Sequence, residues 1–237
     1  MNNNDLIWLH ENCIGDNNFC DNISVVNRRV GFLTGTYWAW KNYDKLGNPE
    51  YFGSFGYRKL LAPSFLKNIN NYDIILPEKT ETITTLKKQI IDCHGIVMYD
   101  AMIKLMGISY PEELENFINY LKMDCGYFYE LYVMKQNIFF EFCTWVFKVL
   151  NNSLSLFSNA KIENHCNIPQ YGQFLNMDNK SEVRDIAFII ERITGYYLYK
   201  LTQKENTKYC EVPVLSTEDL SMNVAILKKI REKVKNV

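Results

Sequence analysis

Short strand-like segments alternate with helical segments along this chain, and this alternation restricts the possible folds more than any other feature. Between residues 26 and 40, apolar side chains recur at steps of three and four residues, which predicts one face of a helix that ends near Gly47. Residues 73–77, Asp-Ile-Ile-Leu-Pro, predict a buried strand that is stopped by its proline. Strands interspersed with helices are typical of a layered α/β domain.

The rest of the chain continues this alternation. The other strand candidates are short apolar or alternating segments, and they cover residues 6–9, 51–61, 127–134 and 211–215. The other helix candidates cover residues 82–123 with breaks at Gly95 and Gly107, residues 138–150, residues 182–201, and a basic segment that begins at 216. The least regular segment, residues 151–179, predicts a long loop of the kind that forms a wall or lid over a site. We therefore expect one α/β domain over residues 1–237, with a mixed central sheet and many helices.

Charge and cysteine usage exclude several classes of protein. The net charge is −1, so the chain lacks the basic excess that binds a phosphate backbone, and we expect no nucleic-acid partner. The seven cysteines are scattered without a Cys-x-x-Cys pair, which is typical of reduced thiols in a cytosolic protein. The sequence shows no signal-peptide pattern and no run of about 20 apolar residues. We therefore expect a cytoplasmic protein that does not span a membrane.

Three blocks in the first quarter of the chain carry the most specific pattern. Residues 20–27 are Cys-Asp-Asn-Ile-Ser-Val-Val-Asn, residues 35–42 are Gly-Thr-Tyr-Trp-Ala-Trp-Lys-Asn, and residues 56–59 are Gly-Tyr-Arg-Lys. These blocks resemble the pattern DNIS-x-x-N, ELTALYWAWKN and HYRRYF. That pattern marks a family of sugar transferases from bacterial capsule and lipopolysaccharide gene clusters, formerly catalogued as a domain of unknown function.

Two later blocks extend the resemblance, so that it covers roughly residues 16–200. Residues 129–135 and 142–147 resemble the family's YNMFIMKK and YCEWLF, and residues 184–192 resemble R-x-x-G-F-L-A-E-R. The chain also departs from the pattern: Gly56 replaces a histidine, Lys59 replaces a second arginine, and Phe32 stands where the family has an acid.

The resemblance implies a GT-A type of nucleotide-sugar-binding fold and a glycosyltransferase activity. Such an enzyme would move a sugar from a nucleotide donor, expected to be a uridine diphosphate sugar, to a growing capsular or lipopolysaccharide glycan. Some relatives are similar to galactofuranose transferases, but nothing in this sequence selects the sugar or the acceptor. The alternative, which the departures favour, is a non-catalytic nucleotide- or carbohydrate-binding module of a polysaccharide biosynthesis assembly.

Glycosyl transfer needs positive charge near the leaving diphosphate. Tyr57, Arg58 and Lys59 match the family's HYRRYF block and are candidates for binding the diphosphate, since arginine and lysine both bind phosphate oxygens. The alternative is a strand end that pairs with a surface carboxylate. No two aspartates are separated by a single residue, so no Asp-x-Asp motif supports a divalent metal. We expect no cofactor besides the nucleotide-sugar substrate.

The first block supplies candidates for the rest of the donor site. Asp21, Asn22 and Asn27 could bind a ribose, a base edge or a sugar hydroxyl, and we expect Tyr57 and Arg58 to lie beside Asp21 and Asn22 in one cleft. Short polar side chains before a helix can equally cap it, with Asn22 or Ser24 as the best candidate. Trp38 is a candidate sugar-stacking residue, although its aromatic stripe is more typical of a core.

Glu191 is the first candidate for the base that deprotonates the acceptor hydroxyl, because it lies in an apolar run of the last block. Glu130 is the second, because it stands where the family has asparagine and so changes both charge and hydrogen-bonding capacity. Arg184 and Arg192 are candidate substrate-binding cations. The alternative is a buried ion pair between Glu191 and one of these arginines.

Clustered lysines in residues 228–235 predict peripheral contact with an anionic membrane surface, where lipid-linked acceptors and other polysaccharide biosynthesis enzymes lie. The alternative is a solvated helix end, with cations that suit the helix C-terminal dipole.

Overall fold

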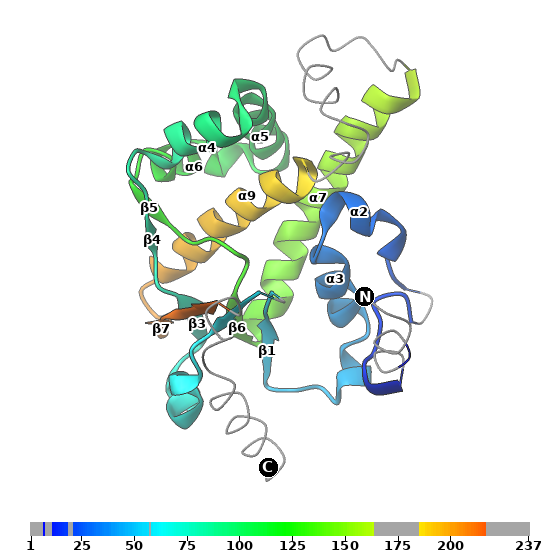
Figure 1. Ribbon diagram of the computed structural model, residues 1–237, viewed down its shortest axis with the longest axis vertical. Coiled ribbons are helices and arrows are strands. Elements are labelled where there is room, and N and C mark those ends of the chain that lie inside the picture. Colours follow the sequence, from blue (N-terminus) through cyan, green and yellow to red (C-terminus); the bar gives the residue numbers. More distant parts are fainter. Residues whose placement is uncertain (1–6, 8–10, 19–20, 57, 164–184, 217–237) are drawn as a thin grey trace.

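A four-stranded mixed sheet forms the centre of the protein. The computed structural model describes residues 7, 11–18, 21–56, 58–163 and 185–216 (Figure 1). The strand order is β1 (Tyr51–Ser54), β6 (Tyr132–Lys135), β3 (Ile74–Pro77) and β7 (Tyr209–Val212). β6 is antiparallel to β1 and β3, whereas β7 is parallel to β3. Strands β1, β3 and β7 therefore run in the same direction, and their C-terminal ends lie at one edge of the sheet.

Strand β3 shows why this sheet is central. All of its residues are buried, as expected for a strand that is covered on both faces. Successive side chains point to opposite faces, and accordingly Ile74 and Leu76 belong to the main hydrophobic core while Ile75 belongs to a smaller second core. Two short strand pairs flank the sheet: β2 (Lys59–Leu61) with β8 (Val214–Ser216), and β4 (Thr80–Glu81) with β5 (Cys125–Gly126).

The long helix α7 (Gln136–Glu163) organises the helical layer. It packs against α3 (Leu33–Lys41), α5 (Ile96–Ser109) and α9 (Asp185–Thr202). Figure 1 shows α7 running through the molecule, with α4 (Leu86–His94), α5 and α6 (Leu114–Tyr120) on one side and α3 on the other. The 3-10 segment η4 (Pro111–Glu113) packs against α5 and α6, whereas the 3-10 segment η3 (Pro63–Asn71) packs against β7 and contributes Phe65 to the second core. None of the helices within the described ranges is long and apolar enough to cross a membrane.

The helix expected over residues 26–40 is interrupted. It is divided into η1 (Ser24–Val26), α2 (Asn27–Val30) and α3, because Gly31 has φ 59° and ψ −132°, a conformation that glycine adopts readily. A Cβ at Gly31 would lie 3.8 Å from the Cβ of Ala187, so the break brings α2 against α9. The predicted end near Gly47 is confirmed, since Gly47 has a left-handed φ of 81° after η2 (Tyr43–Leu46).

The predicted mixed α/β fold is confirmed, with several local differences. The expected break at Gly95 is confirmed, but the one at Gly107 is wrong because α5 continues to Ser109. One glycine costs a helix about 1 kcal/mol, which the packing of its buried face offsets. Residues 51–61 form two strands in different sheets rather than one. Similarly, residues 211–215 are divided between β7 and β8.

Some expectations fall partly or wholly outside the described residues. The loop expected from residue 151 is wrong as far as residue 163, because α7 continues there, and residues 164–179 lie outside the described part. The same holds for the C-terminal helix after 216 and for the basic segment 228–235. Of the strand expected at 6–9, only Ile7 is described, and it is helical.

Candidate active site

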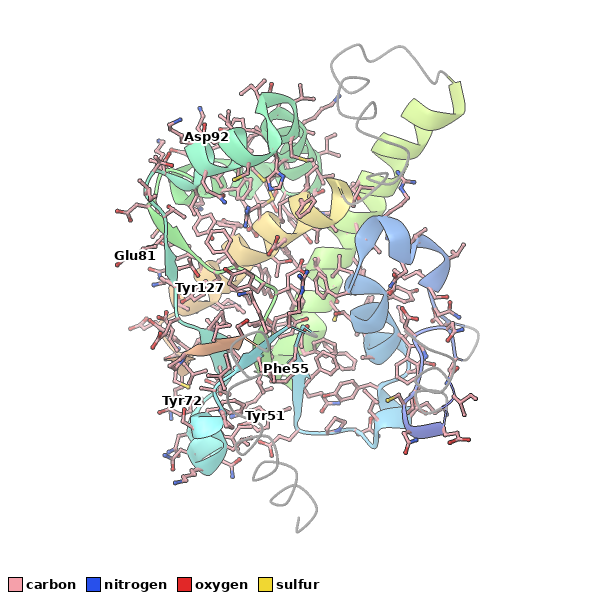
Figure 2. All side chains as sticks on the ribbon, in the orientation of Figure 1. Tyr51, Phe55, Tyr72, Glu81, Asp92 and Tyr127 are labelled. Atoms are coloured by element: carbon pink, nitrogen blue, oxygen red, sulfur yellow. The ribbon has the colours of Figure 1, made fainter. Side chains whose placement is uncertain are left out.

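The candidate site lies where the parallel strands end. β1 ends at Ser54, β3 at Pro77 and β7 at Val212, while the antiparallel β6 begins at Tyr132. In α/β sheets, ligands bind in the crevice beyond the carboxyl ends of the strands. The segment before β6 crosses this edge, where Tyr127 lies between the sheet and α9 (Figure 2). Its hydroxyl donates a hydrogen bond of 2.5 Å to the Glu211 carboxylate of β7.

A strained turn precedes β6 at this edge. Tyr129 and Glu130 are consecutive and have φ values of 70° and 54°, the left-handed region that side chains larger than glycine seldom enter. The strand predicted from residue 127 is therefore wrong before residue 132. The turn is held from α9, because Glu191 Oε1 accepts a 2.9 Å hydrogen bond from the Tyr129 N–H. It is also held from β2, because the Lys59 ammonium lies 4.2 Å from the centre of the Tyr129 ring.

This turn buries the carboxyl group of Glu130. Burial raises the pKa of Glu130 well above its ordinary value, the nearby Glu191 carboxylate raises it further, and the Arg192 guanidinium opposes both effects. The Glu130 Oε1 atom is buried and has no hydrogen-bond partner. A carboxyl group in this environment can hold a proton at a pH where an exposed glutamate would have lost it, and it can exchange that proton with a bound ligand.

Arg192 supplies the positive charge of the cluster. Its Nη1 lies 4.0 Å from Glu191 Oε2, and its guanidinium lies 4.5 Å from the centre of the Phe128 ring. The Arg192 Nε–H is buried and has no acceptor, although buried polar groups are nearly always hydrogen-bonded. The site thus contains an unused donor on Arg192 and an unused acceptor on Glu130. A ligand with both phosphate and hydroxyl oxygens would satisfy the two groups.

The structure brings four of the predicted site residues together: Lys59, Glu130, Glu191 and Arg192. The buried-ion-pair alternative for Glu191 accounts for only part of its contacts, because the carboxylate also accepts the Tyr129 N–H. Tyr57 and Arg184 lie outside the described residues, and the expectation that Tyr57 and Arg58 lie beside Asp21 and Asn22 in one cleft stays a prediction. Arg58 is exposed and lies directly before β2.

Sequence reasoning missed three polar side chains next to this cluster. The buried Tyr132 hydroxyl lies near the hydroxyls of Thr36 and Ser54 without forming a hydrogen bond of normal geometry. Burial raises the pKa of Tyr132, and Glu130 adds to this effect. The three residues come from β6, α3 and β1, so no spacing along the chain could have grouped them.

The first sequence block makes hydrogen bonds that hold its own loop. Asp21 Oδ1 accepts from the Tyr37 hydroxyl at 2.9 Å, and the Asn22 side chain accepts from the Ser24 N–H at 3.2 Å, although the N-cap position of η1 is Ile23. Asn27 donates to Thr34 Oγ1 at 2.7 Å. Trp38 is 5% exposed and donates to the Asn18 carbonyl at 2.6 Å, a core position. Substrate binding by this block stays a prediction.

No three histidine, cysteine, aspartate or glutamate side chains within the described ranges form a group that could hold a metal ion. The expectation that activity needs no metal stays a prediction.

Close packing between α9 and the segment before the turn leads to a testable prediction. A Cβ on Gly195 of α9 would lie 2.5 Å from the Tyr127 carbonyl oxygen, which is too close for a contact with backbone. Gly195→Ala is therefore expected to lower the free energy of unfolding by about 1–3 kcal/mol, the usual cost of overpacking. Urea unfolding followed by circular dichroism measures this change.

Gly35→Ala in α3 is the matched control, because a Cβ there would meet nothing within 4 Å. Alanine is favoured over glycine inside a helix, so this variant is expected to gain up to about 1 kcal/mol. Equal stability of the two variants would show that α9 and the Tyr127 segment do not pack as described.

A known structure shares this fold. A solved structure described as the apo form of the bifunctional glycosyltransferase WbbM matches this chain with a TM-score of 0.65 and 23% sequence identity. The match covers 86% of this chain but only 39% of that chain, so this protein spans about two fifths of the length of WbbM. At this identity the likeness establishes the fold. No curated protein matches significantly. A family model described as "Domain of unknown function (DUF4422)" matches residues 3–204, and the chain therefore belongs to the DUF4422 family.

Proposed function

We propose that this protein is a glycosyltransferase that moves a sugar from a nucleotide donor, a uridine diphosphate sugar, to a growing capsular or lipopolysaccharide glycan. The observation that supports this most is the grouping of Glu130, Glu191 and Arg192 at the carboxyl ends of the parallel strands. The fold shared with a structure described as a glycosyltransferase points the same way.

The chemistry assigns a different task to each group. In a direct displacement, the acceptor oxygen bonds to the anomeric carbon, the bond from that carbon to the donor phosphate breaks, and the acceptor proton is released. Glu130 takes that proton, since its buried carboxyl has a raised pKa. Arg192 and Lys59 stabilise the charge that develops on the leaving diphosphate. Glu191 is a positioning residue, because it holds the Tyr129 N–H and so sets the turn that carries Glu130.

A donor panel tests this proposal. The protein is incubated with uridine, guanosine and thymidine diphosphate sugars, and release of the nucleoside diphosphate is measured with and without a glycan acceptor. One donor is expected to release its nucleoside diphosphate slowly without acceptor and faster with acceptor. The Glu130→Gln variant should release it about a hundredfold more slowly than the parent. Binding of a nucleotide without any turnover would instead support the non-catalytic binding module, which the departures at Phe32 and Gly56 favour.

Arg192 provides a separate prediction about donor binding. Arg192→Lys keeps the charge but removes the buried Nε–H and the planar fork, so uridine diphosphate should bind about tenfold or more weakly. Uridine, which has no phosphate, should be affected much less. Isothermal titration calorimetry compares the two ligands, and Lys122→Gln, which removes an exposed cation, is the control and should bind both ligands as the parent does. Equal losses for uridine and uridine diphosphate would show that Arg192 acts only on the fold.

A further inference from the structure

The outer face of α7 carries a groove that lies apart from the Glu130 and Glu191 cluster. Exposed side chains recur along this helix at steps of four and three residues, at Asn137, Glu141, Thr144, Lys148 and Asn151. All five line one of two cavities, of about 540 and 470 Å³, and Thr144 lines both. The two cavities therefore adjoin at Thr144 on the exposed face of the helix, and together we call them the groove.

The smaller cavity has a rigid aromatic wall between α3 and α7. Trp40 stacks on Phe147 with ring centres 5.4 Å apart and an angle of 5° between the rings. Tyr37 meets both rings edge-on, at 6.1 Å and 5.1 Å, and its hydroxyl is held by Asp21 at the rim. Since these rings already fix one another, a ligand would not have to order them.

The same cavity is positively charged. The Lys41 ammonium lies 3.9 Å from the centre of the Trp40 ring. Lys148 also lines this cavity, and its ammonium lies where the two cavities adjoin, 4.1 Å from the centre of the Tyr110 ring of the larger one. No aspartate or glutamate is among the lining residues, although the Asp21 carboxylate contacts one of them by accepting the Tyr37 hydroxyl. Across the described part of the chain, neither lysine forms an ion pair with a carboxylate. These two cations are therefore available to an anionic ligand.

Polar groups around this cavity suit sugar hydroxyls. The Asn152 side chain donates one hydrogen bond to Ser109 Oγ at 3.0 Å, which leaves its amide oxygen and its second N–H unused. The Thr144 hydroxyl donates to the Phe140 carbonyl at 2.9 Å, so its lone pairs can still accept. Amides and hydroxyls of this kind bind sugar hydroxyl groups.

The larger cavity is aromatic as well. Trp145 stacks on Tyr110 at 5.0 Å and 10°, and its ring centre lies 4.7 Å from that of Tyr197. Trp145 is 7% exposed, and its indole N–H is buried without an acceptor. Such an unpaired donor next to a cavity is unusual, and a ligand oxygen would satisfy it.

Unlike the lysines that line the smaller cavity, the two that line the larger one are paired with carboxylates. Lys200 pairs with Glu113 at 2.7 Å, and Lys204 pairs with Glu141 at 3.6 Å. One end of the groove therefore suits an uncharged sugar, and the other end suits a sugar with a negative charge.

We propose that this groove binds an oligosaccharide of at least two sugar units, with a neutral unit in the larger cavity and a unit that bears a carboxylate or phosphate in the smaller one. Binding itself does not depend on the proposed function. Only the further step, that this glycan is the acceptor or its product, rests on the protein being a glycosyltransferase.

Isothermal titration calorimetry on the full chain tests the proposal. The probes are disaccharides that contain glucuronate or galacturonate, their neutral counterparts, hexose 1-phosphates, and uridine diphosphate. At least one acidic disaccharide or hexose phosphate is expected to bind about tenfold or more tightly than its neutral counterpart, and the better of the two identifies carboxylate or phosphate as the anionic group. The double variant Lys41→Gln, Lys148→Gln should remove this preference.

Lys45→Gln is the matched control, because Lys45 is paired with Asp44 at 2.8 Å and lines neither cavity. Binding to no probe, equal binding of acidic and neutral disaccharides, or preferential uridine diphosphate binding that the double variant abolishes would each overturn the proposal. Repeating the titration with Glu130→Gln separates the two proposals. If the parent transfers no sugar yet both proteins bind the acidic probe, the proposed function fails while the binding groove stands.

Discussion

Replacing Glu130 with glutamine is expected to stabilise the protein at neutral pH while lowering sugar transfer about a hundredfold or more. Burial and the Glu191 carboxylate raise the pKa of Glu130, which means that the ionised form destabilises the folded state. Glutamine has almost the same shape without the charge. It also cannot accept the acceptor proton, so stability and activity should change in opposite directions.

The stability gain should depend on pH. Below about pH 4, near the ordinary pKa of glutamate, the carboxyl is protonated in both folded and unfolded chains, and parent and variant should differ little. Above that pH the unfolded chain ionises first, so the parent loses about 1.4 kcal/mol per pH unit relative to the variant until the raised pKa of folded Glu130 is passed.

Urea unfolding at several pH values measures this gain. Glu115→Gln, at an exposed position of α6, is the control and should show no comparable gain. A Glu130→Gln variant that is less stable than the parent at pH 7 would contradict the burial of an unpaired carboxyl.

Glu191 is expected to respond differently to two substitutions. Glu191→Gln keeps an oxygen that can accept the Tyr129 N–H but removes the negative charge that raises the pKa of Glu130. The acidic limb of the pH–rate profile should therefore move to lower pH, with the maximal rate largely retained. Glu191→Leu removes the acceptor of the Tyr129 N–H, which is exposed, so the loss of stability should be about 0.5–1.5 kcal/mol, but the turn should be disturbed enough to abolish most transfer.

The pH–rate profile and the free energy of unfolding of both variants decide between two roles. If Glu191 were itself the base, Glu191→Gln would lower transfer about a hundredfold at every pH without moving the profile. A variant that is folded and fully active with an unchanged profile would remove Glu191 from the site altogether.

The local sequence pattern was sufficient to predict those helices and strands whose own residues determine their structure. Strand β3 and helix α9 were expected within a few residues, because apolar runs and helical spacing directly reflect which faces are buried. The strand expected over 127–134 was wrong before residue 132, because contacts with residues distant in sequence determine the backbone there. Its alternation continues through Tyr129 and Glu130, but Glu191, 62 residues later, holds that backbone in a left-handed turn.

The candidate site was partly predictable for the same reason. Lys59, Glu130, Glu191 and Arg192 could be named because they fall in blocks that resemble a known family, while their grouping depends on the fold. The groove on α7 carried no motif. Its one signal was the regular spacing of exposed positions on a helix, and such spacing alone does not distinguish a solvated face from a binding face.

The parallel pairing of β3 with β7 has a consequence for biosynthesis. The Asp73 carboxylate accepts a 2.9 Å hydrogen bond from the Lys208 N–H, 135 residues later, so the central sheet cannot be completed until β7 has left the ribosome. Residues 191 and 192 also emerge late. The residues of α3 and α5 emerge before these two, so the carboxylate cluster can form only after residue 192 has left the ribosome. Truncated products would therefore contain much of the helical layer and none of the proposed chemistry.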